Sequence, residues 1–410
     1  MKQKNMIFKI MVLFLALAAV ISSCKKEDSG APTVTNIRST DPAFADISLG
    51  TVGLGQIIAI QGTFLETTKS VTINNFPVIV NPAYATNSNI IITVPDETPT
   101  LATDPDVPNE LVIETEYGVT TIPLVVLPPP PVVNKISNEF AKAGETFIIT
   151  GKYFYFINSI NFPGDVVVTD FTSSADGTTI TVTVPDGVGI GEVFVNTASG
   201  EGSSGPAYKM GDRTGIVCNF DDLNPFKAWG TLPVRVDPNS NPTPAPLDGY
   251  YLRILSGGEI LPGSWWNNDW VMPLEGVQSL PISGPASNFG LKFEMYVPET
   301  WNSGWFEMNF GWFHFYRWRE WAINQPVDEY WGNASGERTN LTTSGWRTVL
   351  IPINLFRQKA GVPGGDPVGN VEDILGKDII WAFQNPDGPD GITLEKLHVC
   401  IDNIRIVKIK

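Results

Sequence analysis

The 410-residue sequence has little histidine and cysteine and no excess of basic charge. Its two histidines, His314 and His398, are too few and too far apart to form a His-rich metal site or a catalytic triad. The formal net charge of −16 excludes nucleic acid as a favoured partner, because the protein's field would repel the phosphate backbone. The same charge mildly disfavours a polyanionic glycan.

Long amphipathic helices are also lacking, because no stretch after the N-terminus keeps an apolar period of 3.6 residues. Instead, 38 glycines and 33 prolines separate short runs rich in Val, Ile, Thr and Phe. This pattern predicts all-β modules, and the length suits about three domains.

The N-terminal segment predicts a lipid anchor. Lys2 and Lys4 precede an apolar run from Ile7 to Ile21, which is too short for an ordinary membrane span. The run ends in Ser-Ser-Cys24 and resembles the lipobox of bacterial lipoproteins. We therefore expect a signal peptide over residues 1–23, lipidation of Cys24 and a tether over residues 24–31; an uncleaved anchor or a chance cysteine is the alternative. The following Lys-Lys-Glu-Asp resembles the surface-export signals of Bacteroidetes lipoproteins.

Two segments repeat at a period of about ninety residues. Gly55 to Phe64 corresponds to Gly144 to Phe154, and each copy later ends a strand at Val-Pro-Asp. Each copy also carries an Asn-Phe-Pro motif. The pattern resembles the immunoglobulin-like IPT/TIG domain and predicts two such sandwiches, at residues 32–127 and 132–208. Neither contains tryptophan or a basic face, so we interpret them as spacers, with Tyr84 and Tyr155 as minor candidates for glycan contact.

Two linkers of different stiffness are expected. Four prolines, Pro128 to Pro131, favour a stiff polyproline II connector between the repeats. The Gly/Ser-rich stretch from Gly200 to Gly211 predicts a looser joint before the last domain.

The last domain, residues 212–410, holds all twelve tryptophans. Its first and last strands, ending in Phe-Asp and containing Ile-Asp-Asn-Ile, resemble the outer strands of jelly-roll carbohydrate-binding modules. A larger jelly-roll-like β-sandwich is therefore expected. Cys218 and Cys400 would lie near each other, as a disulfide or, as we favour, as two buried thiols. Oxygen chemistry also suggests a structural Ca²⁺ at Asp221, Asp222 and Asp402; no other cofactor is expected.

Aromatic residues are concentrated between residues 301 and 331, which hold six tryptophans. Flat aromatic rings suit the C–H-rich faces of sugars, so we predict a carbohydrate-binding surface. Loops rich in Gly, Asn and Ser favour exposure of their tryptophans. The predicted aromatic platform comprises Trp301, Trp305, Tyr330, Trp331, Trp265, Trp266, Trp270, Trp312 and Trp318. The hydrogen-bonding candidates are Asn302, Arg317, Asn267, Asn268, Asp269 and Glu329.

Strand alternation assigns faces within this segment. Phe306, Met308 and Phe310 are expected in the core. A bulge at Gly311 would then place Trp312, His314, Tyr316 and Trp318 on a ligand face, and Phe313 and Phe315 in the core. For Trp312 and Trp318 the ligand face and the core remain open alternatives.

Lipobox, tandem immunoglobulin-like spacers and a tryptophan-rich final sandwich together resemble the surface glycan-binding proteins of Bacteroidetes polysaccharide-utilisation loci. The resemblance implies a lipid-anchored protein on the outer surface of the outer membrane. Its implied partners are polysaccharide, a TonB-dependent transporter, a SusD-like protein and surface glycanases. Trp301, Tyr330 and Trp331 best match the platform of that family.

Glycan hydrolysis is the main alternative, since some sandwich domains use two carboxylates flanking the scissile bond. Glu294 and Glu299 would face opposite sides of one strand, whereas Glu307 and Glu320 remain candidates. An adhesin that binds host protein is a third interpretation. We favour non-catalytic binding of a neutral glycan, most simply a β-glucan, and leave its linkage open.

Overall fold

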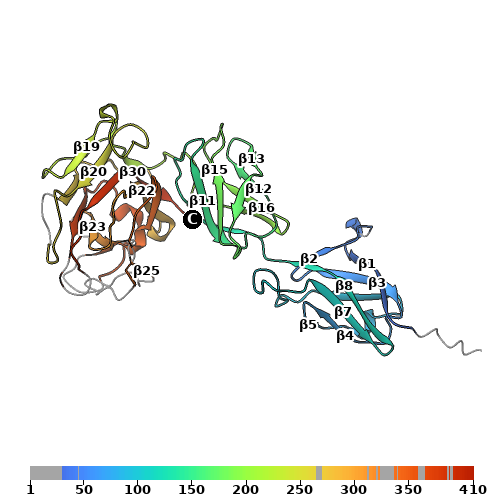
Figure 1. Ribbon diagram of the computed structural model, residues 1–410. Coiled ribbons are helices and arrows are strands. Elements are labelled where there is room, and N and C mark those ends of the chain that lie inside the picture. Colours follow the sequence, from blue (N-terminus) through green and yellow to red (C-terminus); the bar gives the residue numbers. More distant parts are fainter. Residues whose placement is uncertain are drawn as a thin grey trace, which may run out of the picture. The chain divides into compact units, whose positions relative to one another are not determined.

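The computed structural model describes residues 30–44, 46–264, 270–311, 314–319, 322–323, 337–338, 340–358, 365–385, 387 and 391–410. Within these ranges there are strands and short 3-10 helices but no α-helix, which confirms the predicted all-β class (Figure 1). No helix in them has the length and apolarity needed to cross a membrane. The chain divides into two compact units, Met1–Pro129 and Pro130–Lys410.

The first unit is an immunoglobulin-like sandwich around a core of aliphatic side chains. One sheet has the order β1 (Thr33–Ser39), β3 (Ile57–Thr63), β6 (Asn89–Thr93). The other has the order β5 (Phe76–Val78), β4 (Thr68–Ile73), β7 (Glu110–Thr115), β8 (Gly118–Pro123). β2 (Thr51–Gly53) pairs in parallel with β9 (Val125–Leu127), and the 3-10 helices are η1 (Pro42–Phe44) and η2 (Pro82–Tyr84). Tyr84 is exposed, as expected.

The second unit begins with the repeat of this sandwich. One sheet has the order β10 (Val132–Ile136), β11 (Thr146–Lys152), β15 (Thr179–Thr183), β14 (Phe171–Ser173). The other has the order β13 (Val166–Val168), β12 (Ile157–Phe162), β16 (Phe194–Thr197), β17 (Gly200–Ser203). The Asn-Phe-Pro motifs are not equivalent: Phe76 opens β5, whereas Phe162 ends β12.

The C-terminal domain is a sandwich of two larger sheets. The first has the order β19 (Pro233–Val236), β20 (Tyr251–Leu255), β30 (His398–Lys408), β22 (Phe289–Tyr296), β27 (Arg347–Pro352), with β18 (Ile216–Cys218) also paired to β30. The second has the order β21 (Val271–Leu274), β29 (Ile379–Gln384), β23 (Trp305–Phe310), β24 (His314–Trp318), β28 (Arg357–Gln358). Shorter elements are β25 (Ala322–Ile323) paired with β26 (Glu337–Arg338), and the 3-10 helices η3 (Pro238–Ser240), η5 (Ala286–Asn288), η6 (Ile353–Leu355) and η7 (Val371–Asp373).

The first and last strands of this domain are neighbours, as predicted, because β18 pairs with β30. Cys218 and Cys400 are buried free thiols, which confirms the favoured interpretation. Burial raises the pKa of Cys218 to about 12 and also raises the pKa of Cys400. Both thiols therefore stay protonated and inert at neutral pH.

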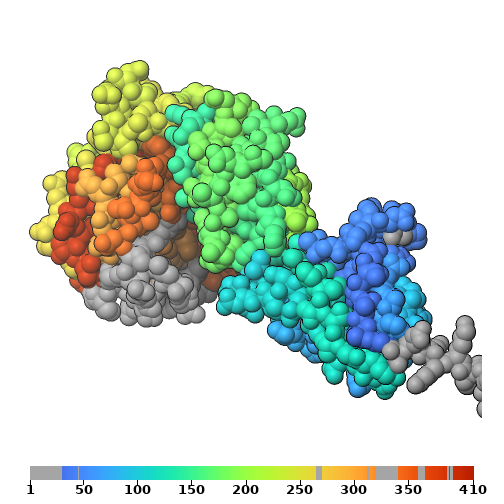
Figure 2. Space-filling view, turned by 45° about the vertical axis from the view of Figure 1, so that its right-hand side comes forward, coloured from blue at the N-terminus to red at the C-terminus, as the bar shows by residue number. Residues whose placement is uncertain are grey.

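The expected loose joint before residue 212 is wrong. The second immunoglobulin-like domain packs on the C-terminal domain within one compact unit, and Figure 2 shows their green and yellow-to-red surfaces in contact. Leu350 of β27 packs against the core of the smaller domain. The Thr348 backbone N–H donates to the Ser137 carbonyl at 2.9 Å, and the Glu139 N–H donates to the Thr348 hydroxyl at 2.8 Å. Gly and Ser in the connecting stretch do not loosen the joint, because contacts distant in sequence hold it.

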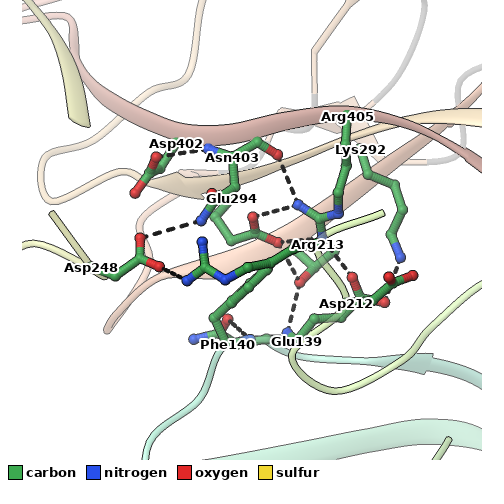
Figure 3. Close-up of polar contacts among 12 residues, drawn as sticks. Glu139, Phe140, Asp212, Arg213, Asp248, Lys292, Glu294, Asp402, Asn403 and Arg405 are labelled. Atoms are coloured by element: carbon green, nitrogen blue, oxygen red, sulfur yellow. Dashed lines mark hydrogen bonds and ion pairs between the residues drawn. The ribbon is translucent and has the colours of Figure 1, made fainter. Parts of the chain in front are cut away.

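A buried ion-pair network crosses this interface (Figure 3). Glu139 of the smaller domain pairs with both Lys292 and Arg405, and Arg405 also makes a two-point contact with Glu294, at 2.7 and 2.8 Å. The four side chains are almost wholly buried, and their charges balance. Burial lowers the pKa of Lys292 and raises that of Glu294, whereas Glu294 and Glu139 outweigh burial and raise the pKa of Arg405. The network requires one relative placement of the two domains, because separating them would leave buried charges unpaired.

Candidate functional site

Part of the aromatic segment forms β23 and β24, which pair with each other in the second sheet of the C-terminal domain. Phe306 pairs with Trp318 and Met308 with Tyr316, and these side chains pack into the sandwich core. Side chains alternate along a strand, so the intervening residues share the opposite face. We call this opposite surface the outer face; its polar and aromatic members are Trp305, Glu307, Asn309, Phe315, Arg317 and Gln384.

A tryptophan and an ion pair dominate the outer face. The Trp305 indole N–H donates to the Gln384 side-chain oxygen at 3.0 Å. The Arg317 guanidinium carbon lies 4.6 Å from the centroid of the Trp305 ring, and its Nε lies 3.6 Å from Glu307 Oε2. Arg319 is also over the Trp305 ring, at 5.8 Å. Cation–π contact and pairing with a carboxylate hold the guanidinium of Arg317 in place.

The chemistry of the outer face suits carbohydrate recognition. Carboxylate, amide and guanidinium groups bond sugar hydroxyls, and an indole ring packs on a pyranose face. The face is closed to solvent, however: Trp305 is 3 % exposed, Glu307 6 % and Arg317 8 %. These side chains therefore present few atoms to a ligand in this conformation.

Trp301 corrects a prediction. It was expected to be exposed in an Asn-Ser-Gly loop but is fully buried, with its ring packed against Phe306 and Trp318. Its indole N–H donates to the Ser303 carbonyl at 2.8 Å, so the turn itself satisfies the polar atom and the ring can enter the core. Trp301 is therefore a core residue and does not present its ring to a ligand.

The other predicted site residues divide into three groups. Trp318 is in the core, which decides between its two alternatives. Trp270 is partly buried against Phe383, and Asn302 is half-buried near Asn340. Outside the described residues lie Trp265, Trp266, Asn267, Asn268, Asp269, Trp312, Glu329, Tyr330, Trp331 and the lipidation site Cys24.

The expected ligand face of β24 is also corrected. His314, Tyr316 and Trp318 do share a face, but it is the core face, whereas Phe315 and Arg317 lie on the outer face. Gly311, with φ of 60°, follows the last residue of β23 and belongs to a hairpin connection, not to a bulge in one strand. Three residues separate the paired Phe310 and His314, so the even-numbered positions stay on the core side in both strands.

Sequence reasoning missed Asn309 and Gln384 as members of the outer face. β29 reads Ile-Ile-Trp-Ala-Phe-Gln and is buried on both faces, so its apolar pattern gives no alternation to follow.

Three of the carboxylates considered for catalysis have charged partners in the structure. Glu294 is buried in the interface network, and Glu299 pairs with Lys396 and His398. Glu307 pairs with Arg317, and Glu320 is outside the described residues. Among described side chains, no group of three His, Cys, Asp or Glu is arranged to hold a metal ion. Asp222 bonds Asn219 at the surface while Asp402 is buried, and the calcium hypothesis stays a prediction.

Comparison with known proteins finds a family model that matches the C-terminal domain. Residues 210–408 match the family model of the surface glycan-binding protein B xyloglucan-binding domain. An IPT/TIG domain-containing protein of Bacteroides ovatus is 34 % identical over 176 residues, which are 43 % of this chain and 36 % of that protein. The chain thus matches little more than a third of that relative's length.

One solved structure shares this fold, and a second aligns over most of this chain. The surface glycan-binding protein B of Prevotella bryantii aligns over 93 % of this chain and all of its own, with 23 % identity and a TM-score of 0.62. The corresponding protein from a complex xyloglucan utilisation locus of Bacteroides uniformis aligns over 92 % of this chain and all of its own, with 20 % identity and a TM-score of 0.48.

Proposed function

Because residues 210–408 match the model of the xyloglucan-binding domain of surface glycan-binding proteins, we propose that this chain binds a neutral β-glucan without cleaving it. That family match is the observation that carries the proposal. Xyloglucan is the first ligand to test, because the family is described by it. The aromatic segment supports the proposal with its tryptophans and with the polar groups of the outer face.

We further propose the cellular setting that the sequence suggests. Cys24 carries lipid, the protein is displayed at the outer surface of the outer membrane, and captured glycan passes to a TonB-dependent transporter and a SusD-like protein. Surface glycanases act on the glycan beside this protein. Labelling with radioactive palmitate, with and without Cys24→Ala, tests the anchor.

Affinity electrophoresis of the mature protein tests the ligand. Gels containing xyloglucan, barley β-glucan, laminarin or mannan are compared for wild type and Trp331→Ala. We expect xyloglucan to retard wild type, and Trp331→Ala to weaken binding at least about tenfold, in the range measured for interface tryptophans.

A matched control is Trp229→Ala. Trp229 is 38 % exposed, with its indole N–H bonded to Glu275, and it lies outside the predicted platform. Its removal should leave retardation unchanged. If no glycan retards wild type, or if both variants lose binding equally, the proposal fails.

The hydrolase alternative has its own test. Prolonged incubation with xyloglucan should release no reducing ends. Release that disappears in Glu307→Gln would instead establish catalysis.

A further inference from the structure

A cleft of about 820 Å³ opens where the second immunoglobulin-like domain meets the C-terminal domain. One wall comes from β10 and β11, and the other from residues 244–247 and 342–347. Its volume lies in the range of ligand sites that hold small molecules. The cleft is separate from the outer face of the second sheet, whose residues do not line it.

The C-terminal wall of the cleft is held in place by its own hydrogen bonds. The Tyr251 hydroxyl donates to the Pro244 carbonyl at 2.8 Å, and the Trp346 indole N–H donates to the Ala245 carbonyl at 2.9 Å. The Trp346 ring packs edge-on against Tyr251 and at a tilt against Tyr296. Tyr296 and Trp346 are half-buried and line the cleft, so it carries aromatic surface on a fixed frame.

Charge in the cleft is opposite to that of the whole chain. Lys135, Lys142 and Arg347 line it with a single carboxylate, Glu145, in a protein of net charge −16. Burial, and then the neighbouring charge of Arg347, lower the pKa of Lys135 to about 8. No hydrogen bond or ion pair joins the Lys135 ammonium group to another described residue. An anion beside Lys135 would favour the charged form of its ammonium group, against the effects of burial and of the Arg347 charge.

We propose that this cleft binds an acidic sugar, a single uronic acid residue within an otherwise neutral oligosaccharide, with its carboxylate at Lys135 and Arg347. A guanidinium and an ammonium group together match a planar carboxylate. Tyr296 and Trp346 offer apolar surface to the sugar ring, and the hydroxyl groups of Thr342 and Ser344 lie on the same wall. The overall negative charge opposes a polyanion but not one carboxylate, whose field is local at physiological salt.

Titration calorimetry of the mature full-length protein tests the assignment. The probe is a xylo-oligosaccharide carrying one glucuronic acid residue, and the matched neutral probe is the same oligosaccharide without it. We expect binding of the acidic probe only, weakened about tenfold by Lys135→Met and abolished by Lys135→Glu. Lys152→Glu makes the same charge change at an exposed position of β11 outside the cleft and should bind as wild type does.

Other results would overturn the inference. If both probes bound equally, or if Lys152→Glu lost as much acidic-probe binding as Lys135→Glu, the cleft would not recognise the carboxylate. Absence of acidic-probe binding at millimolar concentration, or tighter binding of an acidic peptide of equal charge, would also reject it. Because no residue of the outer face lines the cleft, Trp305→Ala, which removes a described residue of the predicted platform, should retain acidic-probe binding. This keeps the test distinct from that of the glucan proposal.

Discussion

The carboxyl group of Asp402 lies fully buried on β30, where Oδ1 accepts the Asn403 backbone N–H at 2.7 Å. Its Oδ2 has no hydrogen-bond partner among the described residues. Burial raises the pKa of Asp402 well above its usual value, and the nearby charge of Asp248 raises it further. The charged form of this residue therefore opposes folding at neutral pH.

We expect Asp402→Asn to raise the free energy of unfolding at pH 7, because the amide removes the cost of holding a charge at a buried position. The native pKa lies above the unfolded one, so the stabilising contribution is complete below the unfolded pKa, about 3.9, and is lost as the pH rises through the native pKa. The advantage of the variant should thus vanish in acid and grow toward neutral pH. Urea unfolding at several pH values measures it.

Calcium gives the contrary outcome for the same residue. If Asp402 were a Ca²⁺ ligand, as the sequence suggested, Asp402→Asn would destabilise the protein and a chelator would destabilise wild type. Unfolding with added Ca²⁺ and with EGTA separates the two cases.

Single residues also show which parts of the candidate site could be predicted from the sequence. The alternation of Phe306, Met308 and Phe310 was correctly assigned to the core. The phase of the next strand was wrong because a glycine in αL suits a bulge and a hairpin turn equally, and the pairing partner decides between them. The burial of Trp301 depends on a hydrogen bond to Ser303 that residue types alone do not specify.

At the scale of elements, the repeat predicted from sequence extends to details of strand geometry. In both immunoglobulin-like domains the first strand shifts register, between Val34 and Asn36 and between Val133 and Lys135. A glycine faces each shift: a Cβ on Gly62 would lie 1.8 Å from the Thr33 carbonyl oxygen, and one on Gly151 would lie 2.0 Å from that of Val132. The glycine of the Gly-x-aromatic motif therefore marks a position where the backbones of two paired strands approach closely.

We expect Gly62→Ala to destabilise the first domain by at least about 3 kcal/mol, at the upper end of the cost of overpacking, because backbone must move to admit the methyl group. Gly50→Ala is the matched control in the same domain, since no atom lies within 4 Å of its added Cβ. That variant should stay within about 0.5 kcal/mol of wild type, as surface substitutions do. If the two variants unfolded at the same temperature, the backbones of β1 and β3 would be able to move apart to admit the methyl group, and the prediction would be wrong.

At the scale of the whole molecule, the sequence predicted three domains but not that the second and third form one compact unit. From composition, we predicted a stiff proline-rich linker between the first two domains and a flexible glycine-rich linker before the third. The association is instead set by Glu139, Lys292, Glu294 and Arg405, which come from distant parts of the chain. Isolated charged residues in strands give no sequence signal of burial, because charged residues are normally exposed.

The interface between these two domains determines the expected thermal unfolding of the protein. Calorimetry of wild type should resolve two transitions, one for residues 1–129 and one for residues 130–410, because the second immunoglobulin-like domain and the C-terminal domain form one compact unit.

The variant Glu139→Gln leaves Lys292 and Arg405 with Glu294 as the remaining carboxylate of the network. An uncompensated buried charge costs about 3–5 kcal/mol, so the second transition should fall in temperature and separate into two. Glu201→Gln, at an exposed position of the same domain, should melt like wild type. Three transitions in wild type, or an unchanged profile in Glu139→Gln, would mean that the buried charges do not couple the domains and that the cleft between them has no fixed shape.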